Sequence, residues 1–394
     1  MNKKPKVVFS NFKNNWKIFS FYILANIFLS GGTPSTKEPT FWSGTIPWIQ
    51  SSDIQKDILF GVIPQKFISE EGLQKSSAKL IPKNSIAIVT RVGVGKLAII
   101  DQDYATSQDF LSLSDINGDT QFIVYSIYRM LQKESTQLQG TSIKGITKED
   151  ILSKKISLPE IEEQSAIGSL FRTLDDLLAR YKENLANYQS LKTTMLSKMF
   201  PKAGQTVPEI RLDGFEGEWK EKEFSKLVKR VTQSSDSDSL PKVEFEDIIS
   251  GQGKLNKDIS TKFDNRKGIH FKPGYTLYGK LRPYLNNWLL PKFEGVALGD
   301  FWVFDPNRND SNFIYYLVQS NRYQKVANDT SGTKMPRSDW KSVSTTIFAI
   351  PQTIAEQQAI GAYFSNLDNL INSHQEKISQ LETLKKKLLQ DMFI

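Results

Sequence analysis

The clearest pattern of hydrophobic and polar positions in this chain is an alternating spacing of four and three residues in two long stretches. Apolar residues recur in this way from Ile167 to Tyr188 and again from Ile360 to Leu381. This spacing is typical of helices that pack along one seam, as in a coiled coil. At 1.5 Å per residue, a helix of about 38 residues is roughly 57 Å long. The predicted helix–helix interface consists of Ile167, Phe171, Leu174, Leu178, Leu185, Ile360, Phe364, Leu367, Ile371 and Ile378.

The two stretches are copies of one another. Glu163–Phe200 and Glu356–Phe393 align without a gap at an offset of 356 − 163 = 193, with about fifteen identical positions. The shared register predicts that the helices pair with each other, antiparallel and nearly symmetric. The alternative is that each helix lies on its own domain. Because glycine costs about 1 kcal/mol inside a helix, the equivalent Gly168 and Gly361 predict close packing near the helix starts.

The segments before the helices diverge but share an opening, Phe12 with Trp16 and Phe215 with Trp219. Short apolar runs between glycine-containing turns predict strands. We therefore expect an α+β fold with a pseudo-twofold internal repeat: two mixed α/β domains joined by two long antiparallel coiled-coil helices. The expected boundaries are residues 1–158 and 203–350 for the domains, and 159–202 and 351–394 for the helices.

The net charge of +8 resides in the divergent segments. Residues 1–159 have 19 Lys and Arg against 13 Asp and Glu, and residues 201–351 have 23 against 19, whereas both helices are nearly neutral. Within the second segment, Lys254–Lys292 has nine basic residues and two acidic ones. Such enrichment favours a polyanionic partner, although on charge alone a solvated basic surface explains it equally well.

Composition narrows the possible chemistry. There is no cysteine and there are only two histidines, His270 and His374, which argues against disulfides and against a zinc enzyme. The longest apolar run, Phe19–Leu29, is shorter than the roughly 20 residues that span a bilayer. We therefore expect a cytoplasmic protein without membrane contact and without a metal site or cofactor of its own.

Catalytic motifs are also missing from the sequence. The run Arg91–Lys96 resembles a phosphate-binding loop but has Thr90 and Leu97 where that motif requires glycine and Ser or Thr. No Asn/Asp-Pro-Pro-Tyr/Phe stretch is present to hold a flipped adenine. The chain is therefore predicted not to be an enzyme by itself. Two alternatives remain open, a self-sufficient DNA nuclease or methyltransferase and a coiled-coil scaffold that does not bind DNA.

Several motifs resemble the specificity subunits of type I restriction–modification systems. They are GGTPSTK from Gly31, KNSIAIVTRVGVGK from Lys83, KPGYTLYGKLRPYLNN from Lys272, and the LP or IP followed by EQ and AI at each helix start. The resemblance covers essentially the whole chain in the order domain, helix, domain, helix. The sequence departs from the family pattern at Ser107-Gln108-Asp109, where relatives often have Asn-Gln, and at Gln352, where a second proline is common.

The resemblance implies a non-catalytic subunit whose two target-recognition domains each read one half of an interrupted sequence in double-stranded DNA. The paired helices would set the spacing between the half-sites and dock two methyltransferase subunits, which use S-adenosylmethionine to methylate adenine N6. A separate restriction subunit, a motor–nuclease, would use ATP and Mg²⁺. No cofactor would bind to this chain itself.

Candidate DNA contacts follow from side-chain chemistry, because Lys and Arg contact phosphates while Arg, Lys, Asn, Gln, Ser and Thr read base edges. Gly279–Tyr284 interleaves basic residues with an aromatic one, which favours DNA binding. Trp42, Trp48, Trp288 and Trp302 are expected in the cores instead. The predicted DNA-binding residues are Thr33, Ser35, Lys37, Arg91, Lys96, Gln108 and Lys144 in the first domain and Lys280, Arg282, Tyr284, Asn286, Asn287, Lys334 and Arg337 in the second.

Overall fold

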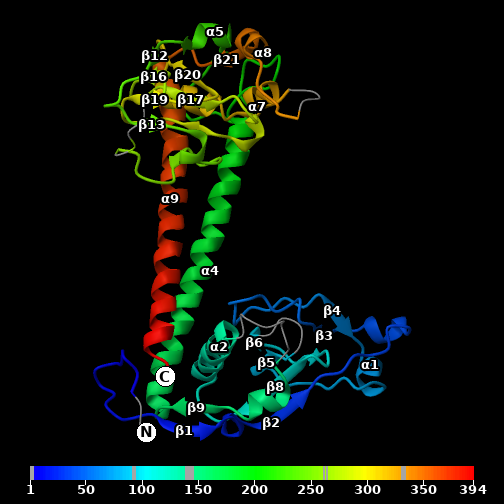
Figure 1. Cartoon of the computed structure of the whole chain (residues 1–394). Helices are drawn as coiled ribbons and strands as arrows, with labels where there is room; N and C mark the ends of the chain where they lie inside the picture. Colours follow the sequence, from blue (N-terminus) through cyan, green and yellow to red (C-terminus); the bar gives the residue numbers. More distant parts are fainter. Residues whose placement is uncertain (1–3, 91–94, 138–145, 261, 263–264, 330–333) are drawn as a thin grey trace. The chain divides into compact units, whose positions relative to one another are not determined.

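In the computed structural model the chain has the expected α+β architecture and divides into two compact units (Figure 1). Unit 1 comprises residues 1–181 and 377–394, and unit 2 comprises residues 182–376. The structure describes all residues except 1–3, 91–94, 138–145, 261, 263–264 and 330–333. The long helices α4 (Ile161–Lys198) and α9 (Ile354–Asp391) lie within the expected helical segments. Both units include part of each helix, so the expected four-segment division stays a prediction.

Unit 1 is centred on an antiparallel sheet with strand order β2-β8-β5-β6. A three-stranded sheet, β4-β3-β7, contributes Ile49 to the same hydrophobic core as Val89 and Phe110 of the first sheet. The strands are β2 (Ala25–Ser30), β3 (Ile46–Ile49), β4 (Lys66–Ile68), β5 (Ser85–Val89), β6 (Leu97–Ile100), β7 (Ala105–Thr106) and β8 (Phe110–Ile116), and the short helices are η1 (Phe21–Leu24), η2 (Pro39–Trp42), α1 (Glu70–Gln74), α2 (Thr120–Gln137) and α3 (Lys148–Leu152).

Unit 2 has two four-stranded sheets instead, β11-β20-β17-β18 and β12-β16-β19-β13. The first is antiparallel, whereas β13 pairs parallel to β19 in the second. The strands are β11 (Lys229–Val231), β12 (Ser234–Ser235), β13 (Lys242–Val243), β14 (Ile248–Ile249), β15 (Lys254–Leu255), β16 (Gly268–Phe271), β17 (Thr276–Gly279), β18 (Trp288–Leu289), β19 (Gly295–Ala297) and β20 (Phe301–Asp305), and the helices are α5 (Phe224–Leu227), η3 (Phe245–Asp247), η4 (Pro283–Leu285), α6 (Ser311–Leu317), α7 (Asn321–Ala327) and α8 (Trp340–Thr345).

Each unit has the same small sheet in front of its long helix. In unit 1, β1 (Lys17–Ser20) pairs antiparallel with β9 (Lys155–Leu158). In unit 2, β10 (Lys220–Glu223) pairs with β21 (Ile347–Ile350) in the same register, so that Lys17 opposite Leu158 corresponds to Lys220 opposite Ile350. The two halves of the chain can therefore be superimposed residue by residue at this point.

The start of each long helix is fixed by a set of contacts that we call the base of the unit. In unit 1, Trp16 Nε1 donates to Glu163 Oε1 at 3.3 Å, and the Asp119 amide donates to Gln164 Oε1 at 3.1 Å. In unit 2, the equivalent bonds join Trp219 to Glu356 at 3.0 Å and Asp310 to Gln357 at 3.0 Å. The Glu-Gln pair of the sequence repeat is therefore a structural motif that ties each helix to its domain.

The repeated glycines lie in these bases, as predicted. A Cβ atom on Gly168 would lie 2.5 Å from Asp119 Oδ1 and 2.7 Å from the Phe122 nitrogen. A Cβ atom on Gly361 would lie 2.8 Å from Asp310 Oδ1. Each aspartate caps the next helix, α2 or α6, by accepting a hydrogen bond from a phenylalanine amide. Only glycine lets the capped helix approach the long helix this closely.

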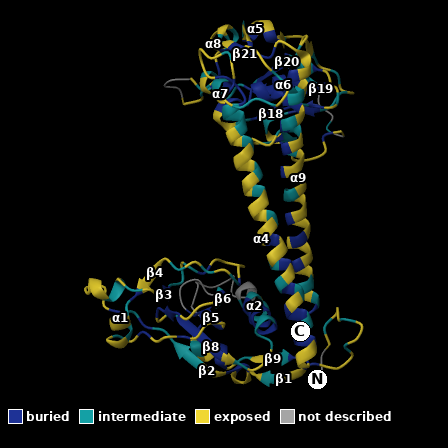
Figure 2. Ribbon diagram, turned by 180° about the vertical axis from the view of Figure 1, so that it is seen from behind, coloured by how far each residue is buried: buried dark blue, intermediate teal, exposed yellow. Residues whose placement is uncertain are grey.

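The long helices pair antiparallel, as expected. In unit 1, Phe171 near the start of α4 packs against Phe393 just beyond the end of α9, with ring centroids 5.5 Å apart. In unit 2, Phe364 near the start of α9 stacks on Phe200 just beyond the end of α4, at 6.0 Å. The start of each helix therefore meets the end of the other in both units. Figure 2 shows the buried residues lining the facing sides of the two helices.

Nine of the ten predicted seam residues are no more than 9% exposed. Leu185 is half-buried. One feature was not predicted: the same 4–3 spacing places a lysine in each seam, Lys192 in α4 and Lys385 in α9. Their side chains are only 13% and 10% exposed.

Each seam lysine completes a partly buried triad with residues of the other repeat. In unit 1, Lys385 forms an ion pair with Asp175, and the Tyr125 hydroxyl donates to the other oxygen of Asp175 at 2.5 Å. In unit 2, Lys192 lies 2.7 Å from Asp368, which accepts from Tyr316 at 2.8 Å. Burial and the nearby aspartate raise the pKa of both tyrosines, so each stays protonated and donates. The partly buried charges are thereby paired and hydrogen-bonded.

Candidate nucleic-acid interface

In unit 1, four of the predicted DNA contacts come from two adjoining segments. Thr33, Ser35 and Lys37 lie on the loop after β2, and the Thr33 hydroxyl donates to Gln108 Oε1 at 2.6 Å. The Gly32 amide donates to the carbonyl of Thr106, the last residue of β7, at 2.9 Å, which holds the loop against the end of that strand. A Cβ atom on Gly31 would lie 2.1 Å from Thr106 Oγ1, so this approach requires glycine. Ser35, Lys37 and Gln108 are exposed beside this contact.

Two tryptophans fix the position of this loop by donating hydrogen bonds to its carbonyl groups. Trp48 Nε1 donates to the Gly32 carbonyl and Trp42 Nε1 to the Ser35 carbonyl, both at 3.0 Å. Their rings meet edge to face at 5.0 Å. Trp48 is buried, as are Trp288 and Trp302 in unit 2, which confirms the prediction that they are core residues. Trp42 is half-buried and packs against the core around Trp48.

Of the remaining candidate residues of unit 1, the structure describes only Lys96. Lys96 donates to the Ser51 carbonyl at 3.2 Å, and Ser51 lies two residues beyond Ile49, whose carbonyl accepts from the Ser107 amide at 3.0 Å. Lys96 is therefore close to the segment that contains Gln108. Arg91 and Lys144 lie outside the described residues.

In unit 2, the carboxylate of Asp300 forms ion pairs with two of the predicted cations. Lys280 Nζ lies 3.7 Å from Asp300 Oδ1, and Arg337 Nη2 lies 2.9 Å from Oδ2. The hydrogen bonds to Asp300 raise the pKa of Arg337. Because the Arg337 guanidinium has five donors and Asp300 uses some of them, the others can reach a phosphate or a base edge. Asp300 is not among the predicted residues, since its contact with position 337 depends on tertiary structure.

The segment directly after Lys280 forms a loop with two strained residues. Arg282 and Asn286 have φ angles of 48° and 54°, in the left-handed region. For residues other than glycine, such backbone costs roughly 1–3 kcal/mol each and tends to cluster at functional sites. The Arg282 amide donates to the Pro336 carbonyl at 2.7 Å, and the Gly251 amide donates to the Asn286 carbonyl at 3.0 Å. These hydrogen bonds hold the two residues in their strained conformation. Tyr284, which lies between Arg282 and Asn286, is 58% exposed.

One of the predicted DNA contacts of unit 2 lies at a buried position. Asn287 is only 7% exposed, and its carbonyl accepts from the Gly279 amide at 2.7 Å. This burial counts against the predicted contact between Asn287 and a base. By contrast, Lys334 is exposed as predicted.

Part of the basic run Lys254–Lys292 is neutralised within the unit, which the sequence alone does not show. Lys257 and Lys262 pair with Asp247, and Lys262 and Arg266 pair with Glu244. Burial raises the pKa of Asp247, but hydrogen bonds from the two lysines outweigh it and leave the pKa lowered. These ion pairs reduce the net positive charge that the run presents to a polyanion.

The outer surface of the long helices carries apolar residues that the seam analysis missed. In unit 1, Leu177 of α4 is 37% exposed and Leu384 of α9 is 45% exposed. In unit 2, Leu191 and Leu370 are 36% and 40% exposed. With the offset of 193, Leu177 corresponds to Leu370 and Leu191 to Leu384, so both units present the same pair. Singly exposed apolar residues are common on protein surfaces, but these leucines recur at equivalent positions of both repeats.

The histidines take part in local contacts. His270 Nε2 lies 2.7 Å from Glu294, and the His374 ring packs against Tyr188 at 5.2 Å. Among the described residues, no group of three His, Cys, Asp or Glu side chains could hold a metal ion. In the same part of the chain, none of the helices combines the length and apolar character needed to cross a membrane.

Comparison with known proteins places this arrangement in one family. The type I restriction modification DNA specificity domain matches residues 13–188 and 249–383. The MjaIX specificity subunit of a type I restriction enzyme from Methanocaldococcus jannaschii is 22% identical over 91% of this chain and 88% of its own length. A type I restriction enzyme specificity subunit from Escherichia coli is 32% identical over 39% of this chain and 40% of its own length.

Solved structures have the same fold. The S subunit of a type I restriction–modification system from M. genitalium matches with a TM-score of 0.65 and 14% identity, over 100% of this chain and 99% of that one. A chain from a structure of a type I R-M system matches with a TM-score of 0.53 and 15% identity, over 96% of this chain and 97% of that one.

Proposed function

The chain belongs to the family of type I restriction–modification DNA specificity subunits, and we propose that it reads a bipartite target in double-stranded DNA, one half-site with each unit. The observation that carries this proposal is that one part of each unit is the same in both units while another part differs. The base and the triad are the same in both, whereas the exposed loops differ: Thr33–Lys37 with Gln108 in unit 1, and Lys280–Asn286 with Arg337 in unit 2. Two different surfaces on equivalent supports suit two different half-sites.

The long helices would set the number of base pairs between the half-sites. Both run without a break from one unit into the other, and both are anchored at each end by buried aromatic contacts. Helices held in this way have a fixed length, so the spacing would be a property of the protein. The half-sites themselves would be chosen by the loops.

The helices would also dock two methyltransferase subunits, which transfer a methyl group from S-adenosylmethionine to adenine N6. The repeated leucine pair supports this, because two copies of one partner need two equivalent surfaces. A restriction subunit would use ATP and Mg²⁺ to move along DNA and cut it. In this scheme the chain acts on cytoplasmic DNA, holds no cofactor and catalyses no step itself.

The spacing role can be tested by lengthening both helices. Seven residues inserted after Tyr181 and seven after Glu376 add one heptad to each helix and leave the seam register of both units intact. At 1.5 Å per residue this adds about 10 Å, or about three base pairs at roughly 3.4 Å each. We expect the methylated motif, read by sequencing DNA from cells that also express the methyltransferase, to keep its bases and to gain about three unspecified positions.

A matched control places seven residues after Gly204, in the exposed link between α4 and β10, where the gap should not change. An unchanged gap in the helix variant would remove the spacing role. Altered bases at both ends would remove the assignment of one half-site to each unit. Methylation by the purified chain alone would remove its non-catalytic role.

A further inference from the structure

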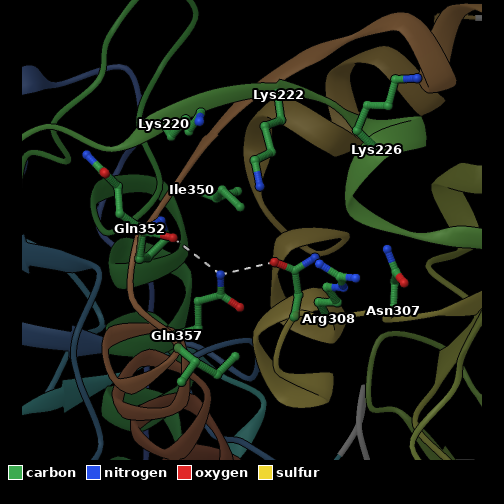
Figure 3. Close-up of a pocket in the computed structure, with 11 residues that line it drawn as sticks. Lys220, Lys222, Lys226, Asn307, Arg308, Ile350, Gln352 and Gln357 are labelled. Atoms are coloured by element: carbon green, nitrogen blue, oxygen red, sulfur yellow. Dashed lines mark hydrogen bonds between the residues drawn. The ribbon is translucent and has the colours of Figure 1, made fainter.

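Unit 2 contains a pocket of about 400 Å³ whose charged lining is entirely positive (Figure 3). Lys220 and Lys222 are two residues apart on β10 and therefore lie on the same face of that strand. Lys226 comes from α5, and Arg308 from the loop between β20 and α6. The polar residues Asn307, Asn309, Gln352 and Gln357 also line the pocket, together with Ile350 and Pro351.

These four cations are not neutralised within the described part of the chain, where none of them forms an ion pair. Glu221 and Glu223 alternate with the lysines on β10 and therefore lie on its other face. In Figure 3, Lys222 points into the space between Ile350 and Arg308. Four like charges around one concavity repel each other and attract anions, because a low-dielectric wall concentrates their field.

The start of α9 adds to the positive potential. Ile354 and Gln357 of its first turn line the pocket, and the aligned peptide dipoles of a long helix place partial positive charge at this end. The one carboxylate of that turn, Glu356, is turned away, because Arg211 and Trp219 both donate to it. The side-chain amide of Gln357 donates from Nε2 to Asn309 Oδ1 and to the Pro351 carbonyl, which fixes the wall of the pocket.

Unit 1 has no equivalent pocket chemistry among its described residues. Aligning β1 with β10 and α2 with α6 places Lys17 at Lys220, Phe19 at Lys222, Ile23 at Lys226 and Asn117 at Arg308. Only one of the four is a cation. The side-chain amide of Asn117 already has partners, since Nδ2 donates to the Ile23 carbonyl at 3.1 Å and to Asn26 Oδ1 at 2.9 Å. The pocket therefore serves an interaction that occurs once per chain, unlike the leucine pairs.

We propose that this pocket binds two or three neighbouring phosphate groups. The pocket is compact, and both a guanidinium and helix N–H groups match phosphate oxygens well. An extended acidic peptide would instead need a groove with cations spread along it. The phosphates can come from a free polyphosphate or from a nucleic-acid backbone outside the half-sites. The inference does not depend on which bases the two units read.

The test compares wild type with Lys222→Gln/Arg308→Gln, using the full chain and titration calorimetry. The control is Lys17→Gln, the counterpart of a pocket lysine in unit 1. With inorganic tripolyphosphate, wild type and control should bind alike and the double variant at least about 10-fold more weakly. If tripolyphosphate does not bind, but the double variant loses affinity for a duplex of arbitrary sequence with a flatter salt dependence, the phosphates come from the backbone.

Unchanged affinity of the double variant for both ligands overturns the proposal. So does a defect confined to binding of a protein subunit, which would identify an acidic segment as the occupant. The unfolding midpoint of the double variant without ligand should equal or exceed that of wild type, because repulsion is removed. If it falls instead, Lys220→Gln, at a more exposed position, repeats the comparison with the same expected direction of change.

Discussion

The triads of unit 1 and unit 2 have the same geometry, whereas the sheets beside them have different strand orders. Lys385 Nζ lies 5.6 Å from the Tyr125 ring centroid and Lys192 Nζ lies 5.5 Å from that of Tyr316. Yet unit 1 has a four-stranded and a three-stranded sheet where unit 2 has two four-stranded ones. Where a residue packs against the other repeat, close packing leaves little freedom to change its size or chemistry. Where it faces solvent, different loops are compatible with the same support.

The ends of the two long helices also have equivalent contacts in the two units. The Val7 amide donates to the Asp391 carbonyl at 3.0 Å, and the Ile210 amide donates to the Lys198 carbonyl at 3.0 Å, which are equivalent bonds at the ends of α9 and α4. The side chains nearby have exchanged charges, since Lys6 faces Asp391 while Glu209 faces Lys198. The N-terminal segment thus takes the place in unit 1 that the link after α4 takes in unit 2.

The largest effect is expected from removing the aromatic residue that each helix end contributes to the other repeat. Phe393→Ala should destabilise unit 1 by about 3–5 kcal/mol, and Phe200→Ala should do the same to unit 2, because both side chains are about 5% exposed. Hydrogen exchange should show lost protection in the affected unit first. Equal loss in both units from either variant would contradict the independence of the two supports.

A smaller effect is expected from the triads. Lys385→Met leaves the partly buried Asp175 without its cation and should cost unit 1 up to about 3 kcal/mol. Lys192→Met should cost unit 2 a similar amount. In a double-mutant cycle, Lys385→Met combined with Asp175→Leu should recover much of the loss, because no unpaired charge remains. Additive losses in chemical denaturation would show that the pair does not interact.

The recognition loops should give effects of about 1–3 kcal/mol, confined to one half-site. Thr33→Ala should weaken discrimination at the half-site of unit 1, and Arg282→Ala at that of unit 2. Binding to duplexes with single base changes measures both. Lys325→Ala on α7 serves as a surface control. A variant that weakens all sequences equally and lowers the salt slope instead marks a phosphate contact.

The smallest expected difference is in sensitivity to acid. Hydrogen bonds from Arg266 and Lys262 lower the pKa of Glu244 from its ordinary 4.5, and the pKa of Asp247 is also lowered from 3.8. Their stabilising contribution is therefore complete above about pH 4.5 and is lost as the pH falls through the lowered values. Burial raises the pKa of Glu163 in unit 1, so its contribution is complete below pH 4.5 and is lost as the pH rises through the raised value.

Acidification from pH 6 to pH 3 should accordingly destabilise unit 2 more than unit 1, although Asp150 in unit 1 also has a lowered pKa. Hydrogen exchange at several pH values measures this difference. Lys262→Met should flatten the profile of unit 2. A steeper acid response in unit 1 would contradict the assignment.

Much of the architecture follows from the sequence. The 4–3 spacing and the offset of 193 predict two paired helices, and the repeated Gly168 and Gly361 predict a close approach that the structure has. The candidate sites are less accessible to sequence reasoning. Asn287 has the chemistry of a base reader but is buried, and the basic run of unit 2 is partly neutralised by Glu244 and Asp247. Hydrogen-bonding capacity is visible in a sequence, whereas exposure and ion pairing are not.

The sequence by itself determined what depends on local periodicity: the helices, their register and the internal repeat, because an apolar seam needs only its own spacing to be recognised. The tertiary structure alone decided which polar groups meet when they lie far apart in the sequence. It joined Lys385 to Asp175, brought Arg337 to Asp300, and collected Lys222, Lys226 and Arg308 around one pocket. Such contacts depend on the path of the whole chain, and therefore no local pattern of residues specifies them.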